Sequence, residues 1–385
     1  SMGQAKERAL ELEDRDYGEP EERLLCSDHF PDYGVKMWVE SNGQPGRCHF
    51  CGKKHRVISA SSIVSFIGTS IVECYTDPAN EMGWVDGAYY SPDGKEPMKA
   101  YELFSKLGIY DIEPEELRED FIGCFAHHDW CVRDPYGMKL DEELSFMWHE
   151  FSRMVKHSRR FTFFRSPEFN REKPDPKSEN GLFDILSEME WAVNNNGLVE
   201  TLPPGTVFYR GRVHKPQVIV DCLKELASPP SDSAKQNRMS PAGVSMFYGA
   251  YDEQTAQIEI EDGLSAKDKK EKNTTIGRFV TTRPLRLIDF SAMPEVSFFA
   301  DDDVDTVAFL RSFAWEISQR VKNPGMVHVE YAPTQVITEF FRYVFKTRGK
   351  KSIHGLIYRS CHNHRPCVVL FMDDKMCPKY LNIED

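Results

Sequence analysis

The stretch "RMSPAGVSMFYGAYDEQTAQIEIE", Arg238–Glu261, is the most informative part of the second half of the chain. Its Pro-Ala-Gly sequence predicts a turn, and the apolar run that ends at Tyr248 predicts a strand. The residues that follow allow two interpretations. The alternation of Ile and Glu in "QIEIED" is typical of a strand, whereas Asp252 is a suitable N-cap for a helix.

Hydrophobic spacing divides the chain into two types of structure. Up to about residue 165 the periodicity is helical, as in "LDEELSFMWHEFSRMVKH", whose apolar residues fall on one face. In the second half, short β-branched and aromatic runs such as "TVFYRGRV" and "CVVLFMD" alternate with two long helix candidates. We therefore predict an α-rich amino-terminal domain followed by an α+β domain.

Composition suggests where these domains begin and end. Residues 1–22 are charged and nearly free of large apolar side chains, which predicts a flexible tail. The segment "NREKPDPKSENG", residues 170–181, is polar and contains two prolines, as expected of a linker. We expect one domain over residues 23–169 and a second over residues 182–385.

The charge and hydropathy of the chain limit the classes of partner that we expect it to bind. A formal net charge of −13 argues against a general affinity for nucleic acid, although it is compatible with a small basic pocket for an anionic metabolite. The longest apolar segment, "SIVSFIGTSIV", is too short and too polar to span a bilayer. The chain does not open on a signal sequence, so we expect a cytoplasmic protein with no membrane or nucleic-acid partner.

The cysteines indicate thiols or a metal site rather than a disulfide framework. Cys26 and His29 form a C-x2-H pair, and Cys48 and Cys51 form a C-x2-C pair. Two such pairs can supply the four ligands of a structural zinc, and "CHFCGKKH" is typical of a zinc knuckle. His55 is an alternative to His29, and chance spacing is the competing interpretation. A second Cys/His group, residues 361–367, has no partner pair and is expected not to bind metal.

Other segments of the second half carry side chains suited to catalysis. Strand alternation places Arg210 and Arg212 on one face of their predicted strand. If that face is buried, the two charges need an anionic partner such as a diphosphate, whereas an exposed face would need none. Ser360 ends another predicted strand and would point at whatever lies beyond its tip.

In order and in wording, these segments closely resemble the RES-domain family, toxins usually found with Xre-like antitoxins. The resemblance covers about residues 195–375 and is carried by five motifs. They are the Tyr-Arg pair Tyr209-Arg210, the turn after Arg238, the strand with Tyr248 followed eleven residues later by Glu259, the "Y-x-P-T-Q" segment from Tyr331 to Gln335, and the strand that ends at Ser360. The Cys/His segment and helices upstream look like the HEPN-like amino-terminal domain that accompanies some RES domains.

The resemblance implies an ADP-ribosyltransferase-like α+β fold and NAD⁺ as the substrate. Family members cleave the nicotinamide–ribose bond with water or phosphate as acceptor, and some relatives transfer ADP-ribose to a protein. An Xre-like antitoxin or another regulatory protein would be the partner. It implies Arg210, Glu259 and Ser360 as catalytic residues and Tyr209, Arg238 and Tyr248 as substrate-binding residues.

These residue types suit that reaction. A carboxylate such as that of Glu259 can stabilise the oxocarbenium-like ribosyl cation, and arginines can clamp a diphosphate. Tyrosines can stack on the nicotinamide ring, and Ser360 can bind the carboxamide or a phosphate. The resemblance also favours a helix at Glu259, and Glu261 is its rival as the inward carboxylate.

Two further functions are less favoured. Many HEPN domains cut RNA with an R-x4-6-H motif, and that spacing occurs at Arg23–His29, Arg348–His354 and Arg359–His364. The first histidine belongs to the predicted zinc site, and the other two lie in predicted loops of the second half. A non-catalytic interaction protein is the other alternative, in which the first half recruits a partner.

Overall fold

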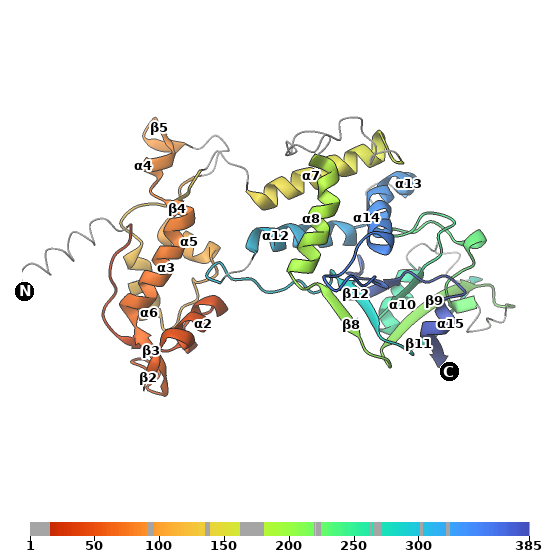
Figure 1. Cartoon of the computed structure of the whole chain (residues 1–385), viewed down its shortest axis with the longest axis horizontal. Coiled ribbons are helices and arrows are strands. Elements are labelled where there is room, and N and C mark those ends of the chain that lie inside the picture. Colours follow the sequence, from red (N-terminus) through yellow and green to blue (C-terminus); the bar gives the residue numbers. More distant parts are fainter. Residues whose placement is uncertain are drawn as a thin grey trace, which may run out of the picture. The chain divides into compact units, whose positions relative to one another are not determined.

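The computed structural model describes most of the chain, and the segments it covers are residues 16–90, 96–134, 139–161, 181–218, 220, 225–261, 264, 271–300, 303–320 and 324–384. The chain forms two compact units (Figure 1). The first ends at Lys139 and also contains Glu295–Val304, and the second contains Leu140–Pro294 and Asp305–Asp385. The predicted linker, up to residue 180, lies outside the described residues.

The first unit is mainly helical, as predicted. Its helices are α2 (Tyr33–Asn42), α3 (Ala60–Cys74), α4 (Pro78–Glu81), α5 (Ala100–Lys106) and α6 (Glu115–Cys124), with a 3-10 turn η1 (Ser27–His29). Its strands are β1 (Leu24–Leu25), β2 (Gln44–Arg47), β3 (Lys54–Ser59), β4 (Tyr75–Thr76), β5 (Gly83–Val85), β6 (Ala88–Tyr90) and β7 (Cys131–Val132). The first three form one antiparallel sheet in the order β1-β3-β2.

Helix α3 contributes several residues to the core of this unit. The Ser59 hydroxyl caps its start by accepting a hydrogen bond from the Ser62 amide at 3.2 Å. Ile63, Ile67 and Ile71 recur at helical spacing and are all buried in the core. The stretch that is too polar to span a bilayer is therefore a buried core helix.

The folded unit begins before residue 23. Residues 1–15 lie outside the described part, but Tyr17 is buried against α3 and the Gly18 amide donates to the Cys124 carbonyl at 2.6 Å. Gly68 allows this packing, because a Cβ there would lie 2.4 Å from the Tyr17 ring. The end of the predicted flexible tail is therefore part of the fold.

The second unit is built on one eight-stranded sheet. Its strands are β8 (Val199–Leu202), β9 (Val207–His214), β10 (Phe247–Ala250), β11 (Asn273–Thr281), β12 (Leu285–Asp289), β13 (Gly355–Arg359), β14 (Pro366–Leu370) and β15 (Leu381–Glu384). Their order is β15-β11-β9-β10-β14-β13-β12-β8, and only the β12–β13 pair is parallel. The predicted α+β class is confirmed.

Helices cover this sheet. They are α7 (Leu140–His157), α8 (Gly181–Asn195), α10 (Glu253–Glu261), α12 (Val304–Ser318), α13 (Val327–Glu330), α14 (Ala332–Tyr343) and α15 (Cys377–Tyr380), with the 3-10 turns η2 (Ser231–Ser233) and η3 (Pro324–Met326). The large core that contains α7, α8, α12 and α14 includes Ile288, Leu356 and Val369 from one sheet face. Leu287, Ile357 and Val368 alternate with them and belong to the core on the other face.

Helix α7 belongs to the second unit, although its sequence falls in the predicted first domain. Its buried residues Leu144, Trp148 and Phe151 pack in the same core as α8 and α14. The Trp148 indole nitrogen donates to Glu316 Oε2 at 2.8 Å, and its ring meets Phe313 edge-on at 5.0 Å. The division between the two compact units therefore falls between Lys139 and Leu140, before α7.

Candidate functional site

The segment with two interpretations is a helix, α10, as favoured by the resemblance. Asp252 caps it, since its carboxylate accepts from the Thr255 amide at 2.8 Å. Glu259 accepts a hydrogen bond from the Ser360 hydroxyl. Glu261 instead accepts from Gln257 on its own helix at 2.8 Å. Of the two rival carboxylates, Glu259 is the one that contacts Ser360.

Ser360 is fully buried and directly follows β13. The loop that follows Ser360 contacts the start of α10 through two polar interactions. The Asn363 side chain donates to Thr255 Oγ1 at 2.8 Å, and Arg365 Nη1 lies 3.3 Å from Asp252 Oδ1. These contacts fix the distance between the strand end and the helix, and so keep Glu259 beside Ser360.

Tyr248, on β10, is hydrogen-bonded to the turn that carries Arg238. Its hydroxyl lies 2.9 Å from Ser240 Oγ, and burial raises its pKa above the usual value. Gln335 in α14 donates to two carbonyls of the turn, Asn237 O at 2.8 Å and Ser240 O at 3.2 Å. The "Y-x-P-T-Q" segment therefore supports the turn, which explains why the two motifs occur together in one site.

Arg238 is half-buried and lacks an acidic partner among the described residues. Its guanidinium lies 5.3 Å from the centre of the Tyr331 ring, and it donates to the Gln319 carbonyl. A guanidinium held by a ring and a carbonyl keeps its full positive charge. It is therefore available to an anionic ligand.

Tyr209 and Arg210 point to opposite faces of the sheet, as strand alternation requires. Tyr209 packs in a small cluster with Ala256 of α10. Arg210 lies on the other face, with its guanidinium 5.4 Å from the Phe247 ring and Nη1 donating to the Tyr248 carbonyl at 2.7 Å. Burial lowers the pKa of Arg210. Of the predicted site residues, Arg210 alone faces away from α10.

Two side chains of the second Cys/His group, which was expected not to bind metal, lie beside Glu259. Cys361 and His362 follow Ser360 directly, and their donor atoms lie within 4.8 Å of one another and of a Glu259 oxygen. What the sequence did not indicate is that Glu259 would lie beside them. Cys367, the other end of that Cys/His group, is buried on β14 and takes no part in this set.

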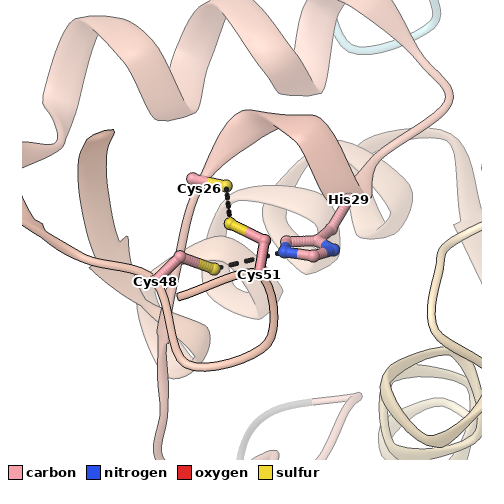
Figure 2. Close-up of side chains that lie close together, drawn as sticks. All are labelled: Cys26, His29, Cys48 and Cys51. Carbon is pink, nitrogen blue, oxygen red and sulfur yellow. Dashed lines mark hydrogen bonds between the residues drawn. The ribbon is translucent and has the colours of Figure 1, made fainter. Parts of the chain in front are cut away.

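The predicted zinc ligands converge in the first unit (Figure 2). Cys26 and Cys51 lie with their sulfurs 3.7 Å apart, and His29 Nε2 lies 3.2 Å from Cys48 Sγ. All four donor atoms are within 4.8 Å of one another. Four ligands around a tetrahedral zinc at about 2.3 Å from each sulfur would have sulfurs about 3.8 Å apart, so the set fits that ion.

The chemistry of the donors also suits zinc. His29 Nδ1 lies 2.8 Å from the Glu113 carbonyl, which can only accept, so Nδ1 carries the proton and Nε2 presents its lone pair. Burial opposes ionisation of Cys48, but amide donors of Cys51, Cys26 and Phe50 outweigh it and lower the pKa to about 6. His55 Nε2 lies 3.5 Å from Asp28 Oδ2, and the donor atoms of these two residues lie within 4.8 Å of one another and of those of Cys26 and Cys51, so His55 stays an alternative to His29.

Family models match both halves of the chain. Residues 41–169 match HEPN/RES N-terminal domain 1, and residues 212–381 match the RES domain. No curated protein and no solved structure matches the chain. The second match contains Arg238, Tyr248, Glu259 and Ser360 but begins after Arg210. Within the part of the chain that the structure describes, every helix is too short or too polar to cross a bilayer.

Proposed function

We propose that this chain, which carries a HEPN/RES N-terminal domain 1 followed by a RES domain, cleaves the nicotinamide–ribose bond of NAD⁺. The observation that carries the proposal is the contact between Glu259 and Ser360, which lie 101 residues apart in sequence. Tyr248 and Arg238 from the neighbouring strand and turn supply an aromatic ring and a cation without an acidic partner among the described residues. We propose an ADP-ribosyltransferase-like arrangement of these groups.

Cleavage requires stabilisation of positive charge on the ribose. Nicotinamide leaves with the electron pair of the glycosidic bond, and the ribosyl carbon becomes oxocarbenium-like. The Glu259 carboxylate, held by the Ser360 hydroxyl, can stabilise that charge. With water as acceptor, the products are nicotinamide, ADP-ribose and one proton. With phosphate as acceptor, the phosphate oxygen forms the new bond to the ribosyl carbon.

The other residues would bind the rest of NAD⁺. Arg238 can hold the diphosphate, because it retains its charge and has free N–H donors. Tyr209 and Tyr248 offer rings on the α10 side of the sheet for the nicotinamide. Arg210 supports the site from the opposite face, by holding the Tyr248 carbonyl.

Product analysis tests this function. Purified protein is incubated with NAD⁺, with and without phosphate, and nicotinamide is measured by chromatography. Release of nicotinamide with ADP-ribose indicates hydrolysis, and a phosphorylated ADP-ribose indicates phosphorolysis. If nicotinamide forms while the ADP-ribose stays attached to protein, the alternative ADP-ribosyltransferase activity holds. An absence of nicotinamide under every condition rejects the proposal.

We propose that the activity serves as a toxin or defence effector, restrained by an antitoxin-like partner. Depletion of NAD⁺ would stop growth in any cell, so an uncontrolled enzyme of this type requires a restraint. Expression of the wild-type chain should lower cellular NAD⁺ and arrest growth, whereas Glu259→Gln should do neither. Growth arrest at an unchanged NAD⁺ level would contradict this role.

We further propose that Cys26, His29, Cys48 and Cys51 hold a structural zinc. All four positions around the ion are occupied by protein ligands, so it has no open position for a substrate. Its role would be to fix η1 against the β2–β3 hairpin.

A further inference from the structure

The hairpin next to the predicted zinc ligands is the most basic part of the first unit. Between Glu40 and Glu73 the sequence contains no Asp or Glu, although the whole chain has a net charge of −13. The same stretch contains four cations, which are Arg47, Lys53, Lys54 and Arg56. All four lie on the hairpin formed by β2 and β3 or on its tip, and all four are exposed.

Strand pairing gathers three of these cations on one face. Arg47 lies opposite Lys54, and Pro45 lies opposite Arg56. Residues two apart on a strand point the same way, so Arg47, Lys54 and Arg56 share the outer face while Val57 points to the core. Lys54 and Arg56 are separated by about 6.8 Å along the strand. That spacing resembles the distance between successive phosphates of an extended nucleic-acid strand.

A groove accompanies these side chains. It has a volume of about 510 Å³ and is lined by Pro45, Gly46, Arg47, Lys54, His55 and Arg56. This lining contains three cationic side chains and one histidine, and it contains no carboxylate. It therefore suits a ligand that carries negative charge.

The three cations are free to bind such a ligand. Among the described residues, none of them forms an ion pair. Arg47 donates to the Gly52 carbonyl at 2.7 Å and Arg56 to the Ser41 carbonyl at 3.4 Å, so each guanidinium is positioned but keeps its charge. Lys53, by contrast, lies 3.9 Å from Asp28.

We propose that the outer face of the β2–β3 hairpin, formed by Arg47, Lys54 and Arg56, binds the phosphate backbone of a single nucleic-acid strand. The face follows an extended row of charges and has no closed walls, as expected for a surface that follows a backbone. Because contacts to backbone phosphates carry no sequence information, we expect binding that depends little on base sequence and is similar for RNA and DNA. This inference does not rest on the proposed NAD⁺ chemistry.

The charge count sets the expected salt dependence. For single strands, the logarithm of the binding constant falls with that of salt concentration, with a slope of about −0.7 for each phosphate contact. Three contacts give a slope of about −2, so affinity should fall about twentyfold between 50 and 200 mM NaCl. Each neutralised side chain should make the slope shallower by about 0.7.

The test uses the full-length protein with fluorescently labelled 20-nucleotide poly-dT and poly-rU and measures anisotropy over a salt series. The triple variant Arg47→Gln, Lys54→Gln, Arg56→Gln should lose nearly all salt-dependent binding. The matched control is Lys350→Gln, Lys351→Gln, Lys375→Gln, which removes the same charge from exposed loops of the second unit. It should bind as wild type does. Metal content and thermal midpoint of both variants report on folding.

Three results would overturn the proposal. The first is a failure of the hairpin to matter, seen either as a triple variant that binds as tightly as wild type or as a wild-type protein that does not bind at 50 mM NaCl. The second is an equal loss in both triple variants, which would indicate a response to net charge alone. The third is tighter hairpin-dependent binding to phosphatidylserine vesicles than to either oligonucleotide, which would identify an anionic membrane surface as the ligand.

Discussion

At the scale of single residues, replacement of Glu259 is expected to have the clearest effect on activity. Glu259→Gln keeps the shape of the side chain and its hydrogen bond with Ser360 but removes the negative charge. We expect NAD⁺ turnover to fall about a hundredfold or more, because the loss acts on the charged transition state. The thermal midpoint should stay within about 2 °C of wild type, because the change is small and lies at an exposed position.

Glu261→Gln is the matched control for that experiment. Its carboxylate accepts from Gln257 on the same helix and does not contact Ser360. We expect nearly wild-type turnover. Equal losses in the two variants would mean that α10 contributes a general negative field rather than one catalytic carboxylate.

Replacement of Arg238 should change substrate binding, whereas replacement of Arg210 should change stability. Arg238→Ala removes a candidate diphosphate ligand, and we expect KM for NAD⁺ to rise by about tenfold or more at an unchanged thermal midpoint. Arg210→Ala leaves the Tyr248 carbonyl without its donor and should destabilise the second unit by about 1–3 kcal/mol. Steady-state kinetics and thermal unfolding of both variants separate the two roles. If Arg210→Ala instead raises KM and leaves stability unchanged, Arg210 contacts NAD⁺ directly.

The resemblance pointed to Glu259, which contacts Ser360, but the sequence did not give the orientation of Arg210. The resemblance selects Glu259, because the family's glutamate lies eleven residues after the tyrosine that matches Tyr248. Alternation shows that Tyr209 and Arg210 face opposite ways, but it does not say which face meets α10. That is decided by packing, since Gly211 leaves room for Ile260 of α10, whose side chain lies 3.3 Å from where a Cβ would be. Such a long-range contact has no local signal in the sequence.

At the scale of elements, α7 shows what periodicity can and cannot predict. The stripe of Leu144, Met147, Trp148, Phe151 and Val155 predicted the helix and its buried face, and both are confirmed. A stripe carries no information about which core it joins. The sequence position of α7 favoured the first domain, whereas its side chains fit the space beside α8 and α14.

Trp148→Ala tests this assignment. The indole packs on Phe313 and donates to Glu316, so its loss leaves a cavity in the second unit. We expect a destabilisation of about 3–5 kcal/mol, with loss of NAD⁺ turnover at a lower temperature. His157→Ala, at the exposed end of the same helix, should change neither quantity. Destabilisation of the first unit instead, seen as earlier zinc release, would return α7 to the amino-terminal domain.

At the scale of the whole molecule, we expect the stability of the first unit to depend on the metal. Zinc bound by four ligands contributes directly to folding, and Cys26 and Cys48 are buried in the cluster it would join. We expect one zinc per chain by elemental analysis. Chelation, or Cys48→Ser, should remove it and lower the unfolding midpoint of the first unit. A metal-free protein with an unchanged midpoint would contradict a structural zinc.

The chain passes between the two units more than once, which has consequences for dissecting the protein. Glu295–Val304 lies between β12 and α12 and within the RES match, yet it belongs to the first unit. Phe299 is 6% exposed in that core, and Ser297 donates to Asp32, the cap of α2, at 2.8 Å. A RES half expressed alone would expose this segment, so we do not expect the two halves to be independent modules.

Phe299→Ala tests that dependence within the intact chain. Loss of a buried phenylalanine costs about 3–5 kcal/mol, and here the cost should fall on the first unit although the residue lies within the RES match. Urea unfolding followed by zinc release to a chromogenic chelator should therefore shift to lower urea. Phe161→Ala is the matched control, because Phe161 is 81% exposed. If zinc release keeps its midpoint in Phe299→Ala, the segment is not needed by the first unit, and the halves are separable.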